Sequence, residues 1–168
     1  MSIKQAVANA VEHLTDHPSE ARYRDSVARA VLRHGLVVDV TGPTGESVTT
    51  DMPPSIGGTG SGPSPGWLSR ASTASCVATL IALRAASFDV VLDSLAVIVD
   101  SESDDRGLLG MEESVPAGPL RMRTRIRISA RGASEESLRD LVEWAEKHSP
   151  VADAIRRSVP MSTEVEFT

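Results

Sequence analysis

The chain has 168 residues, which is long enough for one domain with a real hydrophobic core. Its composition, 40% hydrophobic, 24% charged and only 3% aromatic, is ordinary for a soluble globular protein with an aliphatic core. The net charge of −6 argues against a nucleic-acid partner, because no basic surplus is present to displace counterions from phosphates.

The first third of the chain predicts a helix followed by strands. Apolar residues share one helical face over residues 3–14, and Pro18 follows the end of that pattern. Residues 26–41 are rich in β-formers, with a turn expected at 33–35 and a clearer one at 41–45, before a short strand over 47–52. We expect residues 1–18 to be an amphipathic helical extension and residues 19–168 to form a single domain.

A loop dense in glycine and proline, residues 57–65, leads into a helix of small residues predicted from Trp67 to about Ala86. A proline at a helix start is well placed, because the N–H that it lacks has no partner within a helix. Cys76 is the only cysteine of the chain and lies near the middle of this helix. The segment therefore predicts a sharp loop, a fixed helix start and one thiol about three turns along.

The second half predicts strands around a second helix. A strand is expected over 92–99, and the clearest strand of the chain over 119–131, where apolar residues alternate with arginines. Ser134 is a good N-cap for a helix that Ser149-Pro150 ends, and a short helix over 151–158 and a last strand over 162–167 follow. This order indicates an α+β fold with mostly antiparallel pairing.

The arginines of the 119–131 strand stand on one face, about 7 Å from each neighbour. Such a row repels itself, so we expect acidic side chains from neighbouring strands or a partner chain to interleave with it. The candidates are Asp93, Asp100, Glu102 and Glu112.

Cys76 is the first candidate for chemistry. A lone cysteine on an apolar helix usually behaves as a small buried hydrophobe. Reactivity needs a thiolate, and hence a positive neighbour or a favourable dipole. Because Cys76 lies deep in its helix, an activating charge must come from elsewhere in the fold, and the arginines at 33, 70 and 84 and on the 119–131 strand are available.

Other sites are not supported by the sequence. The glycine-rich loop lacks a following Gly-Lys-Ser/Thr and a strand that leads directly into it, so it does not predict a phosphate site. The four histidines have no metal-ligand spacing, and His13 and His17 are interpreted as a surface pair. We therefore expect neither a metal nor a cofactor.

The cellular compartment is predicted from three features that the sequence lacks: a disulfide pair, a signal peptide and a membrane span. One cysteine cannot form an internal disulfide, so nothing suggests an oxidised secreted scaffold. Residues 1–5 lack the apolar core of a signal peptide, and no apolar run approaches the roughly 18 residues of a membrane span. We expect a cytoplasmic protein with no membrane partner.

The glycines and prolines of residues 57–65, together with Leu68, Ala71 and Cys76, resemble the central signature of the OsmC/Ohr family. Ser149-Pro150-Val151 lies where that family usually has Cys-Pro-Val. The resemblance covers residues 26–167 and leaves out the N-terminal helix. It implies an α+β fold in which antiparallel sheets wrap around a central cysteine-bearing helix, and an intertwined homodimer with active sites at the subunit interface.

The resemblance also implies a chemistry. In such proteins the first cysteine attacks a hydroperoxide and becomes a sulfenic acid, and a second cysteine condenses with it to a disulfide that a dithiol reduces. An arginine and a glutamate beside the first cysteine stabilise its thiolate. Here Cys76 matches the peroxidatic cysteine, while Ser149 takes the place of the resolving one. Gly66 stands where the glutamate is usual, Trp67 follows it, and Arg33 is the candidate for the arginine.

Three functional hypotheses remain. The first is a thiol-dependent hydroperoxide reductase that uses one peroxidatic cysteine, Cys76, to detoxify organic hydroperoxides with an external thiol or dithiol as reductant. The second is a non-catalytic OsmC-like dimer that binds a small apolar molecule or lipid, with Gly66 and Trp67 at its pocket. The third is an interaction domain in which Cys76 is an inert core residue. Because Ser149 cannot form a disulfide, the two-cysteine cycle within one chain is excluded.

Overall fold

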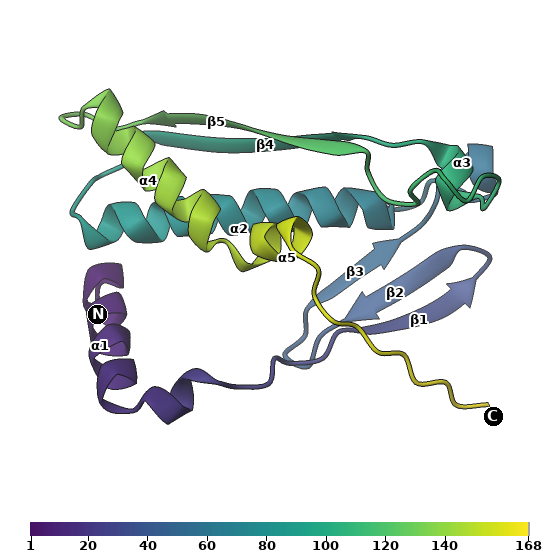
Figure 1. Ribbon diagram of the computed structural model, residues 1–168, viewed down its shortest axis with the longest axis horizontal. Helices are drawn as coiled ribbons and strands as arrows, with labels where there is room; N and C mark the ends of the chain where they lie inside the picture. The colour runs from purple at the N-terminus through teal and green to yellow at the C-terminus, as the bar shows by residue number, and fades with distance from the viewer. Residues whose placement is uncertain (168) are drawn as a thin grey trace. The chain divides into compact units, whose positions relative to one another are not determined.

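The computed structural model describes residues 1–167 (Figure 1). The chain divides into two compact units, Met1–Ser72 and the residues from Thr73 onward. The boundary between them falls within the long helix α2 (Pro65–Ser87). Within the described residues, no helix is both long and apolar enough to cross a membrane.

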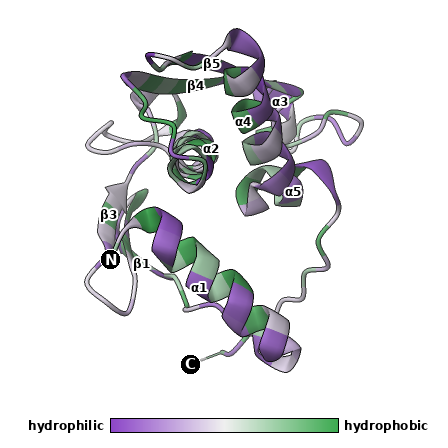
Figure 2. Cartoon of the chain, turned by 90° about the vertical axis from the view of Figure 1, so that its left-hand side faces the viewer, coloured by the Kyte–Doolittle hydropathy of each residue, from purple (hydrophilic) through white to green (hydrophobic). Residues whose placement is uncertain are grey.

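The N-terminal unit begins with helix α1 (Ile3–Asp16) and a short 3-10 helix, η1 (Pro18–Ala21). The Ser2 hydroxyl caps α1 by accepting a hydrogen bond from the backbone N–H of Gln5 at 3.2 Å. Figure 2 shows hydrophobic and hydrophilic residues alternating along α1, as the sequence predicts for an amphipathic helix. None of the residues of α1 is buried.

A three-stranded antiparallel sheet follows in the same unit. It consists of β1 (Arg29–His34), β2 (Val37–Thr41) and β3 (Ser47–Thr50), in the order β1-β2-β3. Gly35 has φ of +53° in the tight turn between β1 and β2, a conformation that glycine adopts without steric cost. The strands predicted over 26–52 are present, with β1 beginning at Arg29, but the first turn lies at residues 35–36 because Arg33 and His34 still belong to β1. The 3-10 helix η2 (Pro54–Ile56) then leads into the glycine-rich loop.

The second unit contains two long antiparallel strands and the helices that pack against them (Figure 1). Strand β4 (Ser94–Glu102) pairs with β5 (Arg121–Ser129) along their full length, from Ser94 opposite Ser129 to Glu102 opposite Arg121. A short helix, α3 (Asp105–Leu108), lies between them and was not predicted. Helices α4 (Glu135–His148) and α5 (Pro150–Arg156) follow β5.

The hydrophobic core of this unit is formed where α2 and α4 meet the apolar face of the two strands. Val77 and Ile81 of α2 and Ala145 of α4 are almost completely buried. Leu95 and Val97 are among the strand residues that pack against them. Burial of each large aliphatic side chain contributes about 1.5–3 kcal/mol, so this cluster fixes α2 against the sheet. The core is aliphatic, as the low aromatic content predicts.

The opposite face of β5 carries the predicted row of arginines, and acidic side chains interleave with it. Arg123 and Arg125 both pair with Asp100 on β4, at 3.1 and 3.0 Å, and Glu102 pairs with Arg121. Asp93 pairs instead with Arg131, just beyond the strand. The expectation is wrong for Glu112, which forms an ion pair with Arg106 near α3.

The predicted last strand is absent from the structure. Residues 162–167 alternate polar and apolar side chains, but the structure assigns them no strand. A strand is defined by hydrogen bonds to a neighbour, and within residues 1–167 no strand pairs with this segment. Its apolar side chains are exposed, with 67% of Val165 and 95% of Phe167 accessible.

Candidate active site

Cys76 lies on α2 in the second unit, next to the core residue Val77. Its thiol is free and the residue is only partly buried, so Cys76 is not one of the fully buried residues of the core. The helix begins at Pro65, two residues before the predicted start, and this places Cys76 about three turns along it. The sulfur is therefore carried by a regular helix, on a residue that is only partly buried.

Ser149 is the side chain that the fold brings to this sulfur. Its hydroxyl donates a hydrogen bond to the Sγ of Cys76 at 3.2 Å and accepts one from the backbone N–H of Ala152 at 3.2 Å. Ser149 itself is completely buried. The sequence comparison with the family motif paired these two positions, and the structure brings them into contact although they are 73 residues apart.

The local sequence explains why the hydroxyl lies there. The residue before a proline avoids the helical conformation, and Ser149 accordingly has an extended backbone with ψ of 113°. Helix α4 therefore ends at His148, and α5 begins at Pro150. Ser149 caps α5 from this bend, and the bend turns its side chain toward α2.

The other predicted site residues lie in the N-terminal unit. Arg33 is on β1, and its guanidinium forms an ion pair with Asp39 at 2.6 Å. The Thr49 hydroxyl and this guanidinium together hold the pKa of the Asp39 carboxyl below its ordinary value. The structure thus gives Arg33 an acidic partner of its own.

Gly66 and Trp67 occupy the first turn of α2. The nearest neighbour of a Cβ added to Gly66 would be an Arg70 nitrogen at 3.8 Å, so the position has room for a side chain. The Trp67 side chain is 50% exposed, and its backbone N–H donates to the hydroxyl of Ser64. An exposed indole is an apolar surface of the kind that pairs with apolar ligands.

A buried carboxylate that the sequence analysis missed organises the glycine-rich loop. Asp51, just after β3, accepts hydrogen bonds from the backbone N–H and the hydroxyl of both Thr59 and Ser61, and from the N–H of Met52. These bonds, above all the one from the Thr59 hydroxyl, hold the pKa of Asp51 far below its ordinary value. The signal in the sequence was the pair of hydroxyl residues alternating with glycines, which indicates an acceptor nearby.

The same network occupies the backbone donors of this loop. The N–H groups of Thr59 and Ser61 already point at the Oδ2 of Asp51, at 3.0 Å each. Backbone N–H groups that converge on an anion are what a phosphate loop offers its ligand. Here an internal carboxylate takes that place.

Arg84 is the second cation on α2 that the sequence made available. Its guanidinium carbon lies 4.3 Å from the ring centroid of Phe88 and 4.7 Å from that of Trp144. Trp144 in turn stacks on His148. Arg84 thus takes part in cation–π contacts within the second unit.

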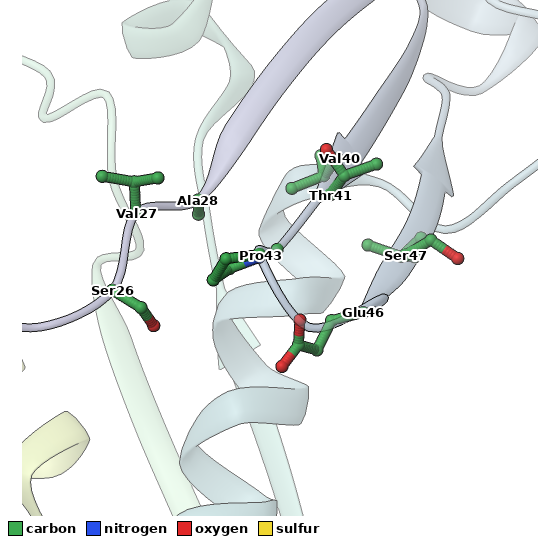
Figure 3. A pocket seen from close by; sticks show the side chains of 10 residues that line it. Ser26, Val27, Ala28, Val40, Thr41, Pro43, Glu46 and Ser47 are labelled. Carbon is green, nitrogen blue, oxygen red and sulfur yellow. The ribbon is translucent and has the colours of Figure 1, made fainter.

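Two hollows in the surface lack redox-active side chains. The first, about 360 Å³, lies in the N-terminal unit and is lined by Val27, Val40, Pro43 and Glu46 among others (Figure 3). The second, about 410 Å³, lies between β5 and α4. Neither is lined by cysteine or histidine. Over residues 1–167 no cluster of three or more histidine, cysteine, aspartate or glutamate side chains could hold a metal ion.

Comparison with known proteins matches this chain to one family. The model of the family described as OsmC-like protein matches residues 58–164. An OsmC-like protein from Mycoplasma pneumoniae superimposes with a TM-score of 0.69 at 15% identity, over 82% of this chain and 91% of that one. An organic hydroperoxide resistance protein OsmC from Legionella pneumophila gives a TM-score of 0.59 at 20% identity, over 80% and 91% of the two chains. No curated protein sequence matches.

A third solved structure extends the comparison. The organic hydroperoxide resistance protein OhrB of Bacillus subtilis superimposes with a TM-score of 0.51 at 18% identity, over 79% of this chain and 92% of that one. At these identities the structures establish the fold: a mixed α+β architecture with Cys76 on its central helix. The matched residues include both Cys76 and Ser149 but begin after Asp51.

Proposed function

The chain belongs to the OsmC-like protein family, and we propose that it is a thiol-dependent hydroperoxide reductase with Cys76 as its peroxidatic residue. The observation that carries the proposal is the contact at Sγ: the free thiol of the partly buried Cys76 accepts a hydrogen bond from the buried hydroxyl of Ser149. A hydrogen bond of this kind favours the anionic form of the acceptor, and the thiolate is the nucleophile. Family members include proteins named for organic hydroperoxide resistance.

The first step is an attack by the Cys76 thiolate on the terminal oxygen of a hydroperoxide, ROOH. A sulfur–oxygen bond forms while the oxygen–oxygen bond breaks, and the alkoxide takes up a proton and leaves as the alcohol ROH. Cys76 is thereby oxidised to a sulfenic acid.

The second step must use an external thiol, because Ser149 cannot form a disulfide. A thiol R′SH condenses with the sulfenic acid to a mixed disulfide and water, and a second thiol releases Cys76 with formation of R′SSR′. The sum is ROOH + 2 R′SH → ROH + R′SSR′ + H₂O. A dithiol would supply both sulfur atoms in one molecule.

We also propose that the working form is a homodimer. Many large apolar side chains are exposed in the single chain, including Leu32 on β1 and Val165 and Phe167 near the C-terminus. An isolated monomer rarely exposes so much apolar surface unless another molecule covers it. A second copy is the partner that the family assignment supports.

One experiment tests the peroxidase directly. The reduced protein is mixed with stoichiometric cumene hydroperoxide in the presence of dimedone, which traps sulfenic acids, and its intact mass is measured. We expect one adduct per chain, mapped to Cys76 and absent from Cys76→Ser. An intact thiol with no adduct, while the peroxide remains unconsumed, would contradict the proposal.

The half-exposed indole of Trp67 favours one alternative function. A half-exposed tryptophan in the first turn of α2 suits an apolar ligand, so a non-catalytic dimer that binds a lipid or small apolar molecule is the second candidate. It predicts a co-purifying ligand in native mass spectrometry, or a thermal shift on addition of fatty acids. With an unreactive thiol, such a shift would favour this candidate over the reductase.

A further inference from the structure

Ser149 occupies a position from which it controls the state of the Cys76 sulfur. We infer that Ser149 is a positioning residue that holds Sγ as a hydrogen-bond acceptor and so favours its thiolate form; this inference rests on the proposed function of Cys76. Ser149 does more, in this view, than fill the space of a cysteine. The argument starts from the two hydrogen bonds of its hydroxyl.

A serine hydroxyl has one proton to donate and two lone pairs to accept with. In Ser149 the Ala152 N–H approaches the oxygen at 3.2 Å, and the proton is directed to Sγ at 3.2 Å. Since Ser149 is completely buried, no bulk water competes for this proton. If the proton were not donated to Sγ, a buried donor would be left unsatisfied, which is costly.

This arrangement distinguishes the two forms of the sulfur. A thiolate accepts the hydroxyl proton as a charge-assisted hydrogen bond, whereas a neutral thiol is a weak acceptor. The hydroxyl therefore stabilises the anion more than the thiol. After reaction with a peroxide, the Ser149 hydroxyl faces the sulfenic acid of Cys76. Because Ser149 has no sulfur, it cannot convert this sulfenic acid to a disulfide.

The charged groups around this bend have other partners. The Nδ1 of His148 lies 2.7 Å from the carbonyl oxygen of Trp144, and Arg157, just after α5, pairs with Asp153 of that helix. Arg156 donates to a backbone carbonyl of α4. Arg84, one of the two arginines of α2, lies over the aromatic rings of Phe88 and Trp144. The hydroxyl is thus the polar group that the structure places on the sulfur itself.

The chain offers a matched control for the loss of this hydroxyl. Ser134 caps α4 as Ser149 caps α5, since its side chain accepts a hydrogen bond from the Ser137 N–H at 3.1 Å. Ser134→Ala and Ser149→Ala each remove one N-cap, but only the second removes a donor to Cys76. Ser149→Gly is a second test variant, because glycine is tolerated at an N-cap with little loss of stability.

The test is the rate at which iodoacetamide alkylates the protein, followed by intact mass from pH 6 to pH 10. Cys76 is the only cysteine, so every adduct reports on it. At pH 7 we expect Ser149→Ala and Ser149→Gly to react about tenfold more slowly than the wild type and Ser134→Ala. Near pH 10, where a free cysteine is ionised anyway, the four rates should converge.

Two outcomes would overturn the inference. Equal rates at pH 7 for the Ser149 variants and Ser134→Ala would show that the hydroxyl does not favour the thiolate. A deficit that persists unchanged at pH 10 would indicate altered access to the thiol and a merely structural role. Because alkylation needs no peroxide, failure of the peroxidase proposal appears separately, as a wild-type protein that alkylates but forms no dimedone adduct.

Discussion

Asp51 accepts hydrogen bonds from both the backbone N–H and the hydroxyl of Thr59, eight residues further along the chain. This contact folds the glycine-rich loop back onto the end of β3. The loop belongs largely to the matched family region, whereas Asp51 precedes residue 58, where the match begins. A residue outside the signature therefore fixes the shape of the segment that leads into α2.

Replacement of Asp51 by asparagine should destabilise the protein and alter its response to acid. The two carboxylate oxygens of Asp51 accept five hydrogen bonds, whereas an asparagine has one acceptor oxygen and an NH₂ group that would face donors. We therefore expect the melting temperature at pH 7 to fall by roughly 5 °C or more. The lowered pKa of Asp51 means that its contribution is complete above the unfolded value of about 4 and is lost as the pH falls toward the folded value.

The measurement is the thermal or urea unfolding of both proteins between pH 3 and pH 7. Wild-type stability should decrease below pH 4, and the stability of Asp51→Asn should depend less on pH over that interval. Curves that run parallel throughout would mean that the Asp51 carboxylate does not contribute to acid sensitivity.

Gly58 should be much less tolerant of a side chain than Gly66, although both belong to the signature loop and helix start. A Cβ on Gly58 would lie 1.8 Å from the carbonyl oxygen of Met52, which is backbone and cannot turn aside. We expect Gly58→Ala to cost about 2–4 kcal/mol in the free energy of unfolding. Gly66→Ala has room in the first turn of α2 and should be neutral or stabilising by about 0.5–1 kcal/mol.

Urea denaturation of the two variants beside the wild type checks this prediction. Both variants lower the conformational entropy of the unfolded chain in the same way, because both replace a glycine by alanine. The difference between their free energies of unfolding therefore reports on the folded state. Similar unfolding midpoints for the two would refute the backbone collision at Gly58.

Ser149→Cys should create a disulfide-forming pair. The Oγ of Ser149 lies 3.2 Å from the Sγ of Cys76, so a sulfur in its place needs only a small further approach to form a bond of about 2.05 Å. Addition of one equivalent of hydroperoxide should then yield an internal disulfide between Cys76 and the introduced thiol, seen as a loss of two hydrogens in the intact mass and reversed by dithiothreitol. A stable dimedone adduct on Cys76 in this variant, with no disulfide, would contradict the proximity of the two positions.

The sequence predicts well those features that depend on neighbours along the chain. Helix α2 begins at Pro65, and Ser134 is the N-cap of α4. The alternating residues before Arg131 form strand β5. The observed strand ends differ from the predicted ones by two or three residues. Strand β4, predicted over 92–99, continues to Glu102 because β5 continues opposite it. Pairing length depends on the partner strand, and a local pattern cannot specify it.

The candidate site was only partly predictable for the same reason. Cys76 could be nominated as the only cysteine of the chain, but its contact with Ser149 joins positions 73 residues apart and was accessible only through the resemblance to a family motif. The role of Asp51 was missed because an acidic residue after a strand is usually exposed, whereas this one is buried under the loop that binds it. Long-range polar contacts of this kind leave little trace in local periodicity.

The C-terminal segment provides the test of the homodimer. Val165 and Phe167 are exposed on one side of an alternating sequence whose other side carries Glu164 and Glu166. Within the described residues this segment pairs with no strand, and its exposed apolar side chains offer a surface that a partner chain could cover. If a second copy covers it, the double variant Val165→Ser/Phe167→Ser should shift the protein from dimer to monomer at micromolar concentration. The matched variant Glu164→Gln/Glu166→Gln, which alters the polar side, should remain dimeric. Sedimentation equilibrium of the three proteins decides the matter: a wild-type monomer, or a dimer equally stable in both variants, would mean that this segment does not hold two copies together.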